Sequence, residues 1–586
     1  MIKRFSISIL ISFLLINFVS AQKTKTDANL IGHVLCEGVH TPFANISLKG
    51  TTIGTLTDGT GHYMLTHLPV GDYIVVASFV GYKTQEKPIS LQSGVSLELN
   101  FDLEKDILGL DEVVVSGNRN AEKRVETPLI INSISPKIFA NAQSQSLSEG
   151  LNFCSGLRLE NNCQNCGFNS VRMNGMEGHY TQILINGRPI FSGLAGVYGL
   201  ELIPSNIIER VEVIRGGGSA MYGGNAIAGT LNIILKDPVT NSYELGLTSG
   251  VIGLGMSDSI WGAPDISGSF NTSLVSDDFK TGMTLYGFSR RRGFFDANND
   301  GISELSPLNN LTLGTRFYHR FGARSKLTFD FFNIMEERNG GNKLETIWHE
   351  RDVSESVKHN IKASSLSLDQ FFRKYDILQV FVAGQFLDRD SYYGANQDLA
   401  AYGKSKDRTF NMGAQYTADL GKSKLIFGFD NIHGNLYDKK MGYPDIENAV
   451  IQNDTILEIP HVDDNCVANQ SSNTIGTFVQ YEFKHGKLKF IAGSRFDSYK
   501  INNYEQSTTK TGNVFIPRVS LMYDVFDFLQ ARVGVSTGYR APQIFDEDLH
   551  VETSGSRQVI NVNDPLLKQE NSYSGTFSLD MNKDFK

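Results

Sequence analysis

The stretch from Tyr243 to the end of the chain constrains the fold most, because it repeats one strand pattern many times. Fourteen strand-like segments of about ten residues each place apolar side chains on one face and polar, charged or small ones on the other. The stretches 425–430 and 529–536 show this alternation clearly. A period of two is the signature of a β-strand, and strands of this kind form a wall between lipid and water.

The connections between these segments alternate regularly in length. The short ones are 276–279, 322–324, 373–375, 421–422, 485–486 and 525–528. The long ones are 251–265, 291–310, 335–361, 388–408, 433–473, 498–513 and 538–571. Membrane barrels keep tight turns on the periplasmic side and extended loops outside. Residues 240–586 are therefore predicted to form a transmembrane antiparallel β-barrel.

Length and charge exclude several other classes of protein. With 586 residues the chain has room for several domains. Past the N-terminus, no stretch approaches the roughly 18 consecutive apolar residues of a membrane-spanning helix, which excludes a polytopic helical protein. The net charge of -9, with no run of Lys or Arg, disfavours nucleic acid as a partner.

Residues 1–21 have the pattern of an export signal peptide. Lys3 and Arg4 precede an apolar stretch, 5–19, and a small-residue cleavage site ends at Ala21. We therefore expect the mature protein to work beyond the inner membrane. Its five cysteines then face an oxidising compartment, where close pairs tend to form disulfides.

Residues 27–103 consist of short alternating segments separated by turns, which predicts a small β-sandwich. Asp58-Gly59-Thr60-Gly61 is a hairpin turn signal between two of these segments. The stretches 50–58, 61–63 and 80–83 resemble the carboxypeptidase-regulatory-like domain. The region carries no nucleophile, base or metal constellation, so it is interpreted as a passive module.

Residues 104–124 are charged and extended, as in a linker, and contain the β-prone stretch 110–117. Three consecutive valines in a flexible segment are able to pair with the exposed sheet edge of another protein. Alternatively, the stretch is a boundary strand that pairs within its own chain, and composition alone favours this second interpretation.

Residues 125–236 form a mixed α/β segment that becomes glycine-rich toward its end. A strand, 208–215, leads into Gly216-Gly217-Gly218, and a second strand follows. The segment has no Gly-Lys-Ser/Thr ending and no Gly-x-Gly-x-x-Gly that opens a helix. Nucleotide binding is therefore disfavoured.

Taken in order, the export signal, the glycine-rich segment and the barrel-like region resemble a TonB-dependent outer-membrane receptor. The resemblance rests on 111–115, on 183–189 together with 208–234, and on Tyr539-Arg540-Ala541-Pro542 followed by Asn563-Asp564-Pro565-Leu566. It implies that 125–236 is the plug. It also implies a TonB box, the segment that couples to TonB, made of Asp111, Glu112, Val113, Val114 and Val115.

The predicted fold is thus dominated by β-structure, with a small N-terminal β-sandwich, a mixed α/β plug and a transmembrane β-barrel. The resemblance implies about 22 barrel strands, a size class that surrounds a plugged lumen. Only fourteen segments are found, and 581–586 lacks the terminal aromatic residue usual for such barrels. We therefore expect a barrel that is truncated at its C-terminal end to about 14 strands.

The resemblance implies a transporter, not an enzyme, in the outer membrane of a Gram-negative bacterium. The function expected is active import of a scarce iron complex, a siderophore or haem, driven by the TonB energy-transducing complex. The expected partners are TonB, outer-membrane lipid and the small-molecule iron complex, with a surface lipoprotein as a further candidate. Cobalamin or glycan import, or a surface sensor or adhesin that does not transport, stay open as alternatives. A secreted hydrolase ranks last, because no catalytic constellation is found.

Candidate substrate-binding residues are polar or aromatic side chains near the plug glycines, together with the Tyr-Arg pair of the barrel motif. They are Asn165, Phe168, Arg172, Tyr222, Tyr539 and Arg540.

A loop in the barrel region has the oxygen ligands of a calcium site at alternate positions. These ligands are Asp296, Asn298, Asp300 and Glu304, with a glycine turn at Gly301. An EF-hand needs Glu at position 12, where this chain has Pro307. The loop is predicted either to bind a structural Ca²⁺ or to be a polar turn, and no other cofactor is required.

Two cysteine-containing groups are further candidates. Cys154, Cys163 and Cys166 are predicted to include a structural disulfide, with soft-metal capture alongside His179 as the alternative. His461, Asp463 and Cys466 are able to ligate a transition metal, although a solvated acidic loop is the more common interpretation of such a stretch.

Overall fold

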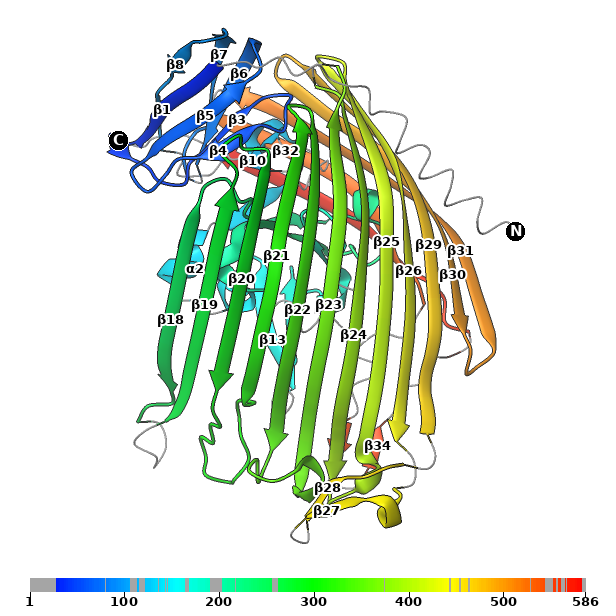
Figure 1. Ribbon diagram of the computed structural model, residues 1–586. Helices are drawn as coiled ribbons and strands as arrows, with labels where there is room; N and C mark the ends of the chain where they lie inside the picture. Colours follow the sequence, from blue (N-terminus) through cyan, green and yellow to red (C-terminus); the bar gives the residue numbers. More distant parts are fainter. Residues whose placement is uncertain are drawn as a thin grey trace, which may run out of the picture.

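The computed structural model is dominated by β-strands, as predicted, and arranges them in three successive parts (Figure 1). The residues that it describes are 28–79, 81–105, 113–114, 122–134, 136–142, 144, 146–163, 168–189, 203–216, 218–255, 262–373, 375–441, 444–452, 455–461, 464–526, 528–542, 552–554, 557–559, 564 and 566–581. The predicted export signal lies outside these residues.

The first part is the predicted β-sandwich, in which two sheets enclose one apolar core. One sheet contains β1 (Ala28–Cys36), β2 (Val39–His40), β5 (His62–Leu68), β8 (Ser96–Glu98) and β9 (Phe101–Leu103). The other has the order β4 (Gly54–Leu56), β3 (Asn45–Leu48), β6 (Gly71–Ser78) and β7 (Gln85–Leu91). Leu30, Ile46, Leu65 and Val75 are fully buried between the sheets, because alternate residues of each strand point inward.

The second part is a mixed sheet with short helices. The sheet order is β12 (Ile131–Ile134), β16 (Ile208–Arg215), β17 (Gly229–Leu235) and β15 (Thr181–Ile185), and only the last pair is parallel. The helices are η1 (Arg124–Glu126), α2 (Pro136–Asn141), α3 (Leu147–Leu151), η2 (Gly178–Tyr180), η3 (Ser205–Ile207) and α5 (Ser219–Tyr222). Two hairpins are added, β10 (Val113–Val114) with β11 (Glu122–Lys123), and β13 (Leu157–Cys163) with β14 (Phe168–Met173). Every residue of β17 is buried, so this sheet forms the centre of the plug.

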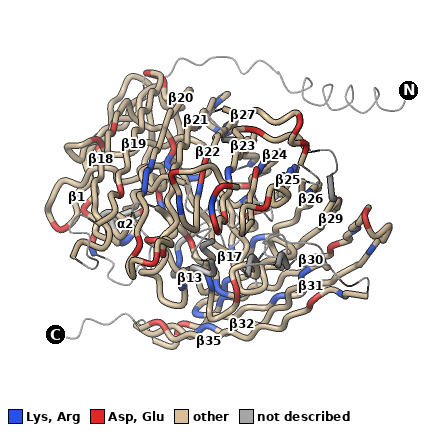
Figure 2. The backbone as a smooth tube through the Cα atoms, turned by 90° about the horizontal axis from the view of Figure 1, so that it is seen from below, with Lys and Arg blue, Asp and Glu red and all other residues tan. Residues whose placement is uncertain are grey.

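The third part is one sheet of fourteen antiparallel strands, which confirms the predicted number. The strands are β18 (Ser242–Ile252), β19 (Ala263–Val275), β20 (Thr281–Arg292), β21 (Leu308–Gly322), β22 (Ser325–Gly341), β23 (Val353–Phe371), β24 (Ile377–Ala395), β25 (Tyr402–Asp419), β26 (Ser423–Met441), β29 (Asp464–His485), β30 (Leu488–Asn503), β31 (Thr508–Phe526), β32 (Leu529–Arg540) and β35 (Glu570–Met581). The sheet curves around the plug (Figure 2). Among the described residues, β18 pairs only with β19, and β35 only with β32.

Several strands extend well into the predicted long loops. The predicted loop 335–361, for example, contains the end of β22 and the start of β23. The predicted loop 433–473 contains the end of β26 and the start of β29. The predicted boundaries are wrong here because the strand ends present polar side chains on both faces, so the apolar alternation stops before the hydrogen bonding does. The remaining loop elements are η4 (Trp348–Glu350), η5 (Leu399–Ala401), η6 (Ile446–Asn448), β27 (Val450–Gln452), β28 (Thr455–Glu458), β33 (Glu552–Ser554) and β34 (Arg557–Val559).

The two faces of the curved sheet differ in chemistry, as a wall between lipid and water requires. Val382 and Phe429 point outward and remain about half exposed, whereas the polar Gln385 and Asn411 point inward and are buried. Within the part of the chain that the structure describes, no helix is long and apolar enough to span a membrane.

The β-sandwich lies at the end of the sheet where the tight turns are (Figure 1). The Thr52 backbone N–H donates to the Ala323 carbonyl oxygen at 2.7 Å, and the Thr66 hydroxyl donates to the Asp277 carbonyl oxygen at 3.3 Å. Ala323 lies in the turn between β21 and β22, and Asp277 in the turn between β19 and β20. The long loops lie at the opposite end.

We expect Gly229→Ala to destabilise the plug. Gly229 opens β17 with a φ of 148°, and a Cβ there would overlap the Ile214 carbonyl oxygen and the Met173 sulfur. Limited proteolysis and thermal unfolding of the purified chain in detergent are the measurements. Gly575→Ala is the matched control, because a Cβ at Gly575 meets nothing within 4 Å. Equal proteolysis rates for the two variants would contradict the predicted strain.

Candidate functional site

The structure describes two residues of the predicted TonB box, Val113 and Val114, and both are paired in a short hairpin. Val113 and Val114 form β10, which pairs antiparallel with β11 through Val113–Lys123 and Val114–Glu122. The Val114 side chain is fully buried in a cluster, called here the α5 cluster, that joins the plug to the barrel wall. Its members are Val114, Leu129, Ile131, Leu184, Ile214, Met221, Tyr222, Ile426, Phe478 and Ile491. Asp111, Glu112 and Val115 lie outside the described residues.

A buried arginine holds the barrel against α5. Arg495 on β30 donates from Nε to Asp497 Oδ1 at 2.6 Å and from Nη1 to Asp430 Oδ2 at 3.0 Å. The same Nη1 lies 3.5 Å from the Met221 carbonyl oxygen at the plug helix, and Tyr539 donates its hydroxyl to Asp497 Oδ2 at 2.8 Å. One guanidinium thus bridges two carboxylates, and the arginine extends this network to the plug.

Glycines allow the close approach that this network requires. A Cβ at Gly223 would lie 3.2 Å from Arg495 Nη2, and one at Gly224 would lie 3.2 Å from the Tyr539 ring. On the barrel side, a Cβ at Gly476 would overlap the Arg495 guanidinium. The glycine-rich stretch of the plug therefore serves backbone packing against the barrel.

A second ion-pair group joins the plug to the opposite wall. Arg290 on β20 contacts Asp265 at 2.6 Å and Glu149 of the plug helix α3 at 3.0 Å. Arg316 on β21 contacts Asp330 at 2.7 Å and Asp237, which follows the last plug strand, at 2.8 Å. The plug is thus held by charged contacts on both sides of the lumen.

A row of polar residues crosses the inner face of five strands toward the long loops. This polar row consists of Glu336, His359, Arg389, Ser405 and Asp438, one from each strand from β22 to β26. Each is the register partner of the next, so they lie side by side, and all are buried. Arg389 Nε donates to Ser405 Oγ at 3.0 Å, and Arg389 Nη2 lies 3.7 Å from Asp438 Oδ1. The row is a continuous line of buried hydrogen-bond donors and acceptors on the inner face of the sheet.

The long loops above this row are held together around Tyr402. The Tyr402 hydroxyl lies 2.8 Å from His349 Nδ1, and its ring is centred 4.9 Å from Tyr392 and 5.9 Å from His461. Burial lowers the pKa of the His349 imidazole, so its neutral form is favoured at neutral pH. The cluster fixes three loop segments relative to one another at the outer end of the lumen.

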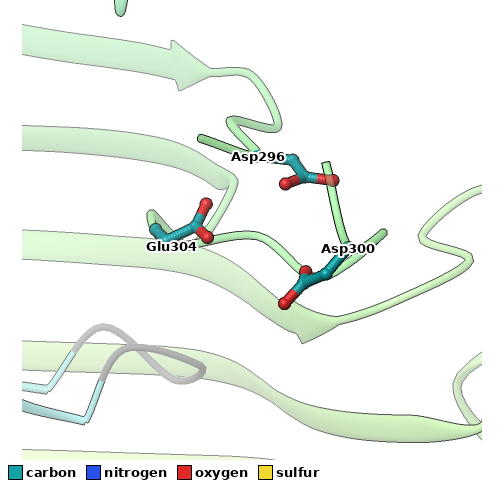
Figure 3. A group of neighbouring side chains, drawn as sticks. All are labelled: Asp296, Asp300 and Glu304. Atoms are coloured by element: carbon teal, nitrogen blue, oxygen red, sulfur yellow. The ribbon is translucent and has the colours of Figure 1, made fainter. Parts of the chain in front are cut away.

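The predicted calcium loop brings its carboxylates together (Figure 3). Oxygens of Asp296, Asp300 and Glu304 lie within 4.8 Å of one another, and the described residues contain no other such group of carboxylate, imidazole or thiol ligands. Asp296 accepts the backbone N–H groups of Asn299 at 2.7 Å and Gly301 at 2.8 Å, which curls the loop around the carboxylate. Asn298 hydrogen-bonds to Asp300 at 3.1 Å. The geometry suits a hard cation, and calcium occupancy stays a prediction.

The predicted substrate residues lie in different surroundings. Tyr222 is buried in the α5 cluster, and Tyr539 is buried beside Asp497. Arg172 pairs with Glu160 across the β13–β14 hairpin. The Arg540 guanidinium lies 5.5 Å from the centre of the Tyr180 ring.

Tyr222 and Tyr539 lie at the contact between plug and barrel. The role of all these residues in substrate binding stays a prediction. Asn165 and the side chain of Phe168 lie outside the described residues.

The cysteine predictions are addressed only in part. Cys154 is a buried free thiol, while the Cys163 side chain and Cys166 lie outside the described residues, so a disulfide between those two stays a prediction. Cys466 is also free, with its sulfur 3.7 Å from the Asp438 carbonyl oxygen. His461 Nε2 lies 3.0 Å from the Leu399 carbonyl oxygen, and Asp463 is outside the described residues.

Sequence reasoning missed the polar row and the Arg495 network. In the sequence, each of these residues is only a polar residue at an inward-facing strand position. Every barrel strand has such residues, so they do not stand out. Asp430 and Arg495 lie on β26 and β30, and strand pairing alone brings them together.

Family models match almost the whole chain. The TonB-dependent receptor plug domain matches residues 123–230, the CarboxypepD_reg-like domain matches 30–115, and the TonB dependent receptor-like beta-barrel matches 256–585. The barrel match alone spans more than half of the chain. This chain belongs to the TonB-dependent receptor family. TonB-dependent receptors are outer-membrane transport proteins of Gram-negative bacteria, not enzymes.

Individual proteins resemble the receptor over different lengths. The iron-regulated outer membrane virulence protein of Vibrio cholerae is 24% identical over 515 residues, covering 84% of this chain and 69% of that protein. The vitamin B12 transporter BtuB of Vibrio vulnificus is 35% identical over 124 residues, covering 21% of this chain and 20% of that protein. Several curated relatives are matched over only about a fifth of their length.

The fold also resembles solved structures. Pseudomonas aeruginosa FpvA, in a complex with a heterologous pyoverdine and iron, superimposes with a TM-score of 0.60 at 13% identity, covering 80% of this chain and 62% of FpvA. At this identity the likeness concerns the fold alone.

We expect Arg495→Met to loosen the plug. Removal of the guanidinium leaves Asp430 and Asp497 buried without their countercharge, and breaking a buried pair in this way costs about 3–5 kcal/mol. Denaturant unfolding and protease sensitivity of the plug in detergent are the measurements. Arg373→Met, in an exposed turn, is the control. Unchanged plug protection in Arg495→Met would contradict the role of this network.

We expect Ca²⁺ to protect the loop 291–307 from proteolysis and to lose this effect in the double variant Asp296→Asn, Asp300→Asn. The amides keep the shape of the side chains but remove the charge that a hard cation requires. The control is Asp388→Asn, in an exposed ion pair elsewhere on the barrel. Equal Ca²⁺ responses in the receptor and the double variant would show that the loop is a polar turn.

Proposed function

We propose that this receptor imports a scarce iron complex, a siderophore or haem, across the outer membrane with energy supplied through TonB. The proposal is carried by the match to the iron-regulated outer membrane virulence protein, which covers 84% of this chain. The plug and barrel models match consecutive parts of the same stretch, so the likeness extends over both parts that handle a cargo.

The chemistry of the polar row supports a cargo of this class. Ferric siderophores and haem present carboxylate, hydroxyl and other oxygen groups at their surfaces. Arg389 is a planar donor suited to carboxylate oxygens, and Glu336 and Asp438 accept hydrogen bonds from hydroxyl or amide groups. These residues lie on the inner face near the outer ends of β22 to β26, where they are buried.

The position of Val114 supports coupling between the plug and TonB. Val114 shares the α5 cluster with Met221, whose carbonyl oxygen contacts Arg495. A cargo that shifts α5 therefore disturbs the packing that holds Val114 in place. Once released, the box segment is able to add a strand to a sheet edge of TonB, because an extended chain offers its backbone N–H and C=O groups for pairing.

Cobalamin import is the second candidate. It is favoured by the match to BtuB, which has higher identity than the iron-related match but covers a much shorter stretch. Import of either cargo requires the same coupling to TonB. The two candidates are therefore distinguished by an uptake assay in which each cargo is offered separately.

We expect Val114→Pro to abolish uptake while cargo still binds to the cell surface. Proline removes the backbone N–H that a TonB strand pairs with, and it leaves the polar row untouched. The measurement is uptake of labelled iron, offered separately as siderophore and as haem, and of labelled cobalamin, by cells that produce the receptor from its own gene. Uptake by the variant is expected to fall to the level of cells treated with a proton uncoupler.

Val114→Ile is the matched control, because it keeps both the N–H and the β-branched side chain. Normal uptake by Val114→Pro would remove the coupling assignment. Uncoupler-sensitive uptake of cobalamin and not of iron would favour the second candidate. Surface binding of iron complexes without energised uptake would point to a sensor or adhesin.

A further inference from the structure

Three histidines from separate parts of the N-terminal sandwich meet on one face. His33 on β1 and His62 on β5 are direct cross-strand partners, and His40 on β2 pairs with Leu35, two residues from His33 on the same face of β1. Because side chains alternate along a strand, all three point away from the core that Val34 and Leu65 fill. Their ring centres lie 5.0 Å (His33–His40), 5.8 Å (His33–His62) and 4.8 Å (His40–His62) apart.

The ring centres are as far apart as those of three imidazoles on one metal ion, but as the rings stand no choice of their nitrogens brings all three within 4.8 Å, so rings have to turn before they share an ion. A tetrahedral ion with nitrogen ligands at about 2.0–2.1 Å holds the ring centres about 5 Å apart. The His40 and His62 rings stack with 25° between their planes, so with the His62 ring held by Thr60 it is the His40 ring that has to turn. Both side chains are exposed, and rotation of an exposed imidazole about its last torsion meets little resistance.

The hydrogen bonds around His62 leave one ring nitrogen ready to bind a metal. The Thr60 hydroxyl donates its single hydrogen to Asp58 Oδ1 at 2.7 Å and lies 3.1 Å from His62 Nδ1. It therefore accepts a hydrogen from Nδ1, which leaves the lone pair on His62 Nε2. A metal-binding histidine usually donates its other ring N–H to a carboxylate, a carbonyl or a water, and here the Thr60 hydroxyl, itself bound to Asp58, takes that place.

The backbone also brings the hairpin turn close to β2. Gly61 has a φ of 80°, and a Cβ there would lie 2.7 Å from the Thr41 nitrogen and 2.9 Å from the His40 Cβ. Only glycine allows this approach, and it places His62 beside His40.

We propose that His33, His40 and His62 form a binding site for a divalent transition-metal ion of the zinc type on the N-terminal sandwich. Imidazole nitrogen is a preferred ligand of Zn²⁺, Cu²⁺ and Ni²⁺, and the exposed face leaves the fourth position to water or to a ligand. The ion ties β1, β2 and β5 together. The same face of β5 carries Thr66, which contacts the barrel turn at Asp277, so the site lies beside the junction of sandwich and barrel.

The test is Zn²⁺ titration of the full-length receptor in detergent, purified with a tag free of histidine and competed against a chromophoric chelator. We expect a single tight equivalent, which the double variant His40→Gln, His62→Gln loses with a drop in affinity of about 100-fold. Thr60→Val is expected to weaken binding about tenfold, because it removes only the support of His62. His67→Gln is the matched control, an exposed histidine of β5 outside the cluster.

X-ray absorption at the zinc edge provides the second readout. Imidazole scattering is expected from the receptor and from His67→Gln, and is expected to disappear in the double variant. Equal Zn²⁺ affinity in the receptor and the double variant would overturn the proposal. A loss in His67→Gln as large as that in the double variant, or a spectrum with oxygen ligands only, would overturn it as well.

Discussion

The structure depends on one constraint, which is that backbone N–H and C=O groups inside a lipid layer have to find partners within the protein. Fourteen antiparallel strands meet this constraint along the ladders that they share from β18 to β35, whereas the outer edges of β18 and β35 have no partner strand among the described residues. The ladder also determines the side chains, because alternate residues must face either lipid or lumen. Apolar residues such as Val382 and Phe429 occupy the outer positions, so polar residues are left for the inner ones.

The plug fills the lumen and buries the polar inner face of the sheet. The charged side chains on that face therefore need partners. Arg495 with Asp430 and Asp497, and Arg290 with Asp265 and Glu149, meet that requirement by pairing charges. Buried pairs contribute little net stability compared with apolar packing, but a wrongly placed partner leaves a charge unpaired at high cost. Only the pairs that cross from barrel to plug, such as Arg290 with Glu149, bear on how the plug is oriented in the lumen.

Features that depend on patterns within a short stretch of sequence were predicted. Features that depend on which residues of neighbouring strands pair were missed. The fourteen strands, the two-sheet sandwich and the convergence of Asp296, Asp300 and Glu304 all follow from patterns within short stretches. Strand ends were placed too early, because polar ladders beyond the lipid layer have no apolar alternation. The polar row from Glu336 to Asp438 has members on five strands, and no spacing along the chain shows that they are neighbours. Val114 is predicted to belong to the TonB box by its place before the plug, whereas its burial depends on partners distant in sequence.

The plug packs against the barrel through three separate apolar clusters, and this division matters for how a pulled segment acts. The smallest joins Ala220 of α5 to Tyr499, Ile516 and Tyr539 of the barrel. The α5 cluster joins Val114 and Met221 to Phe478 on one wall. A larger cluster joins most of the plug core, including Leu231, to Phe332 and neighbouring residues on the other wall. In the coupling proposed above, force applied at Val114 acts first on the α5 cluster and on the Arg495 contact beside it. A passage opened there requires the loss of far fewer contacts than removal of the whole plug, because the larger cluster and the Arg290–Glu149 pair stay intact.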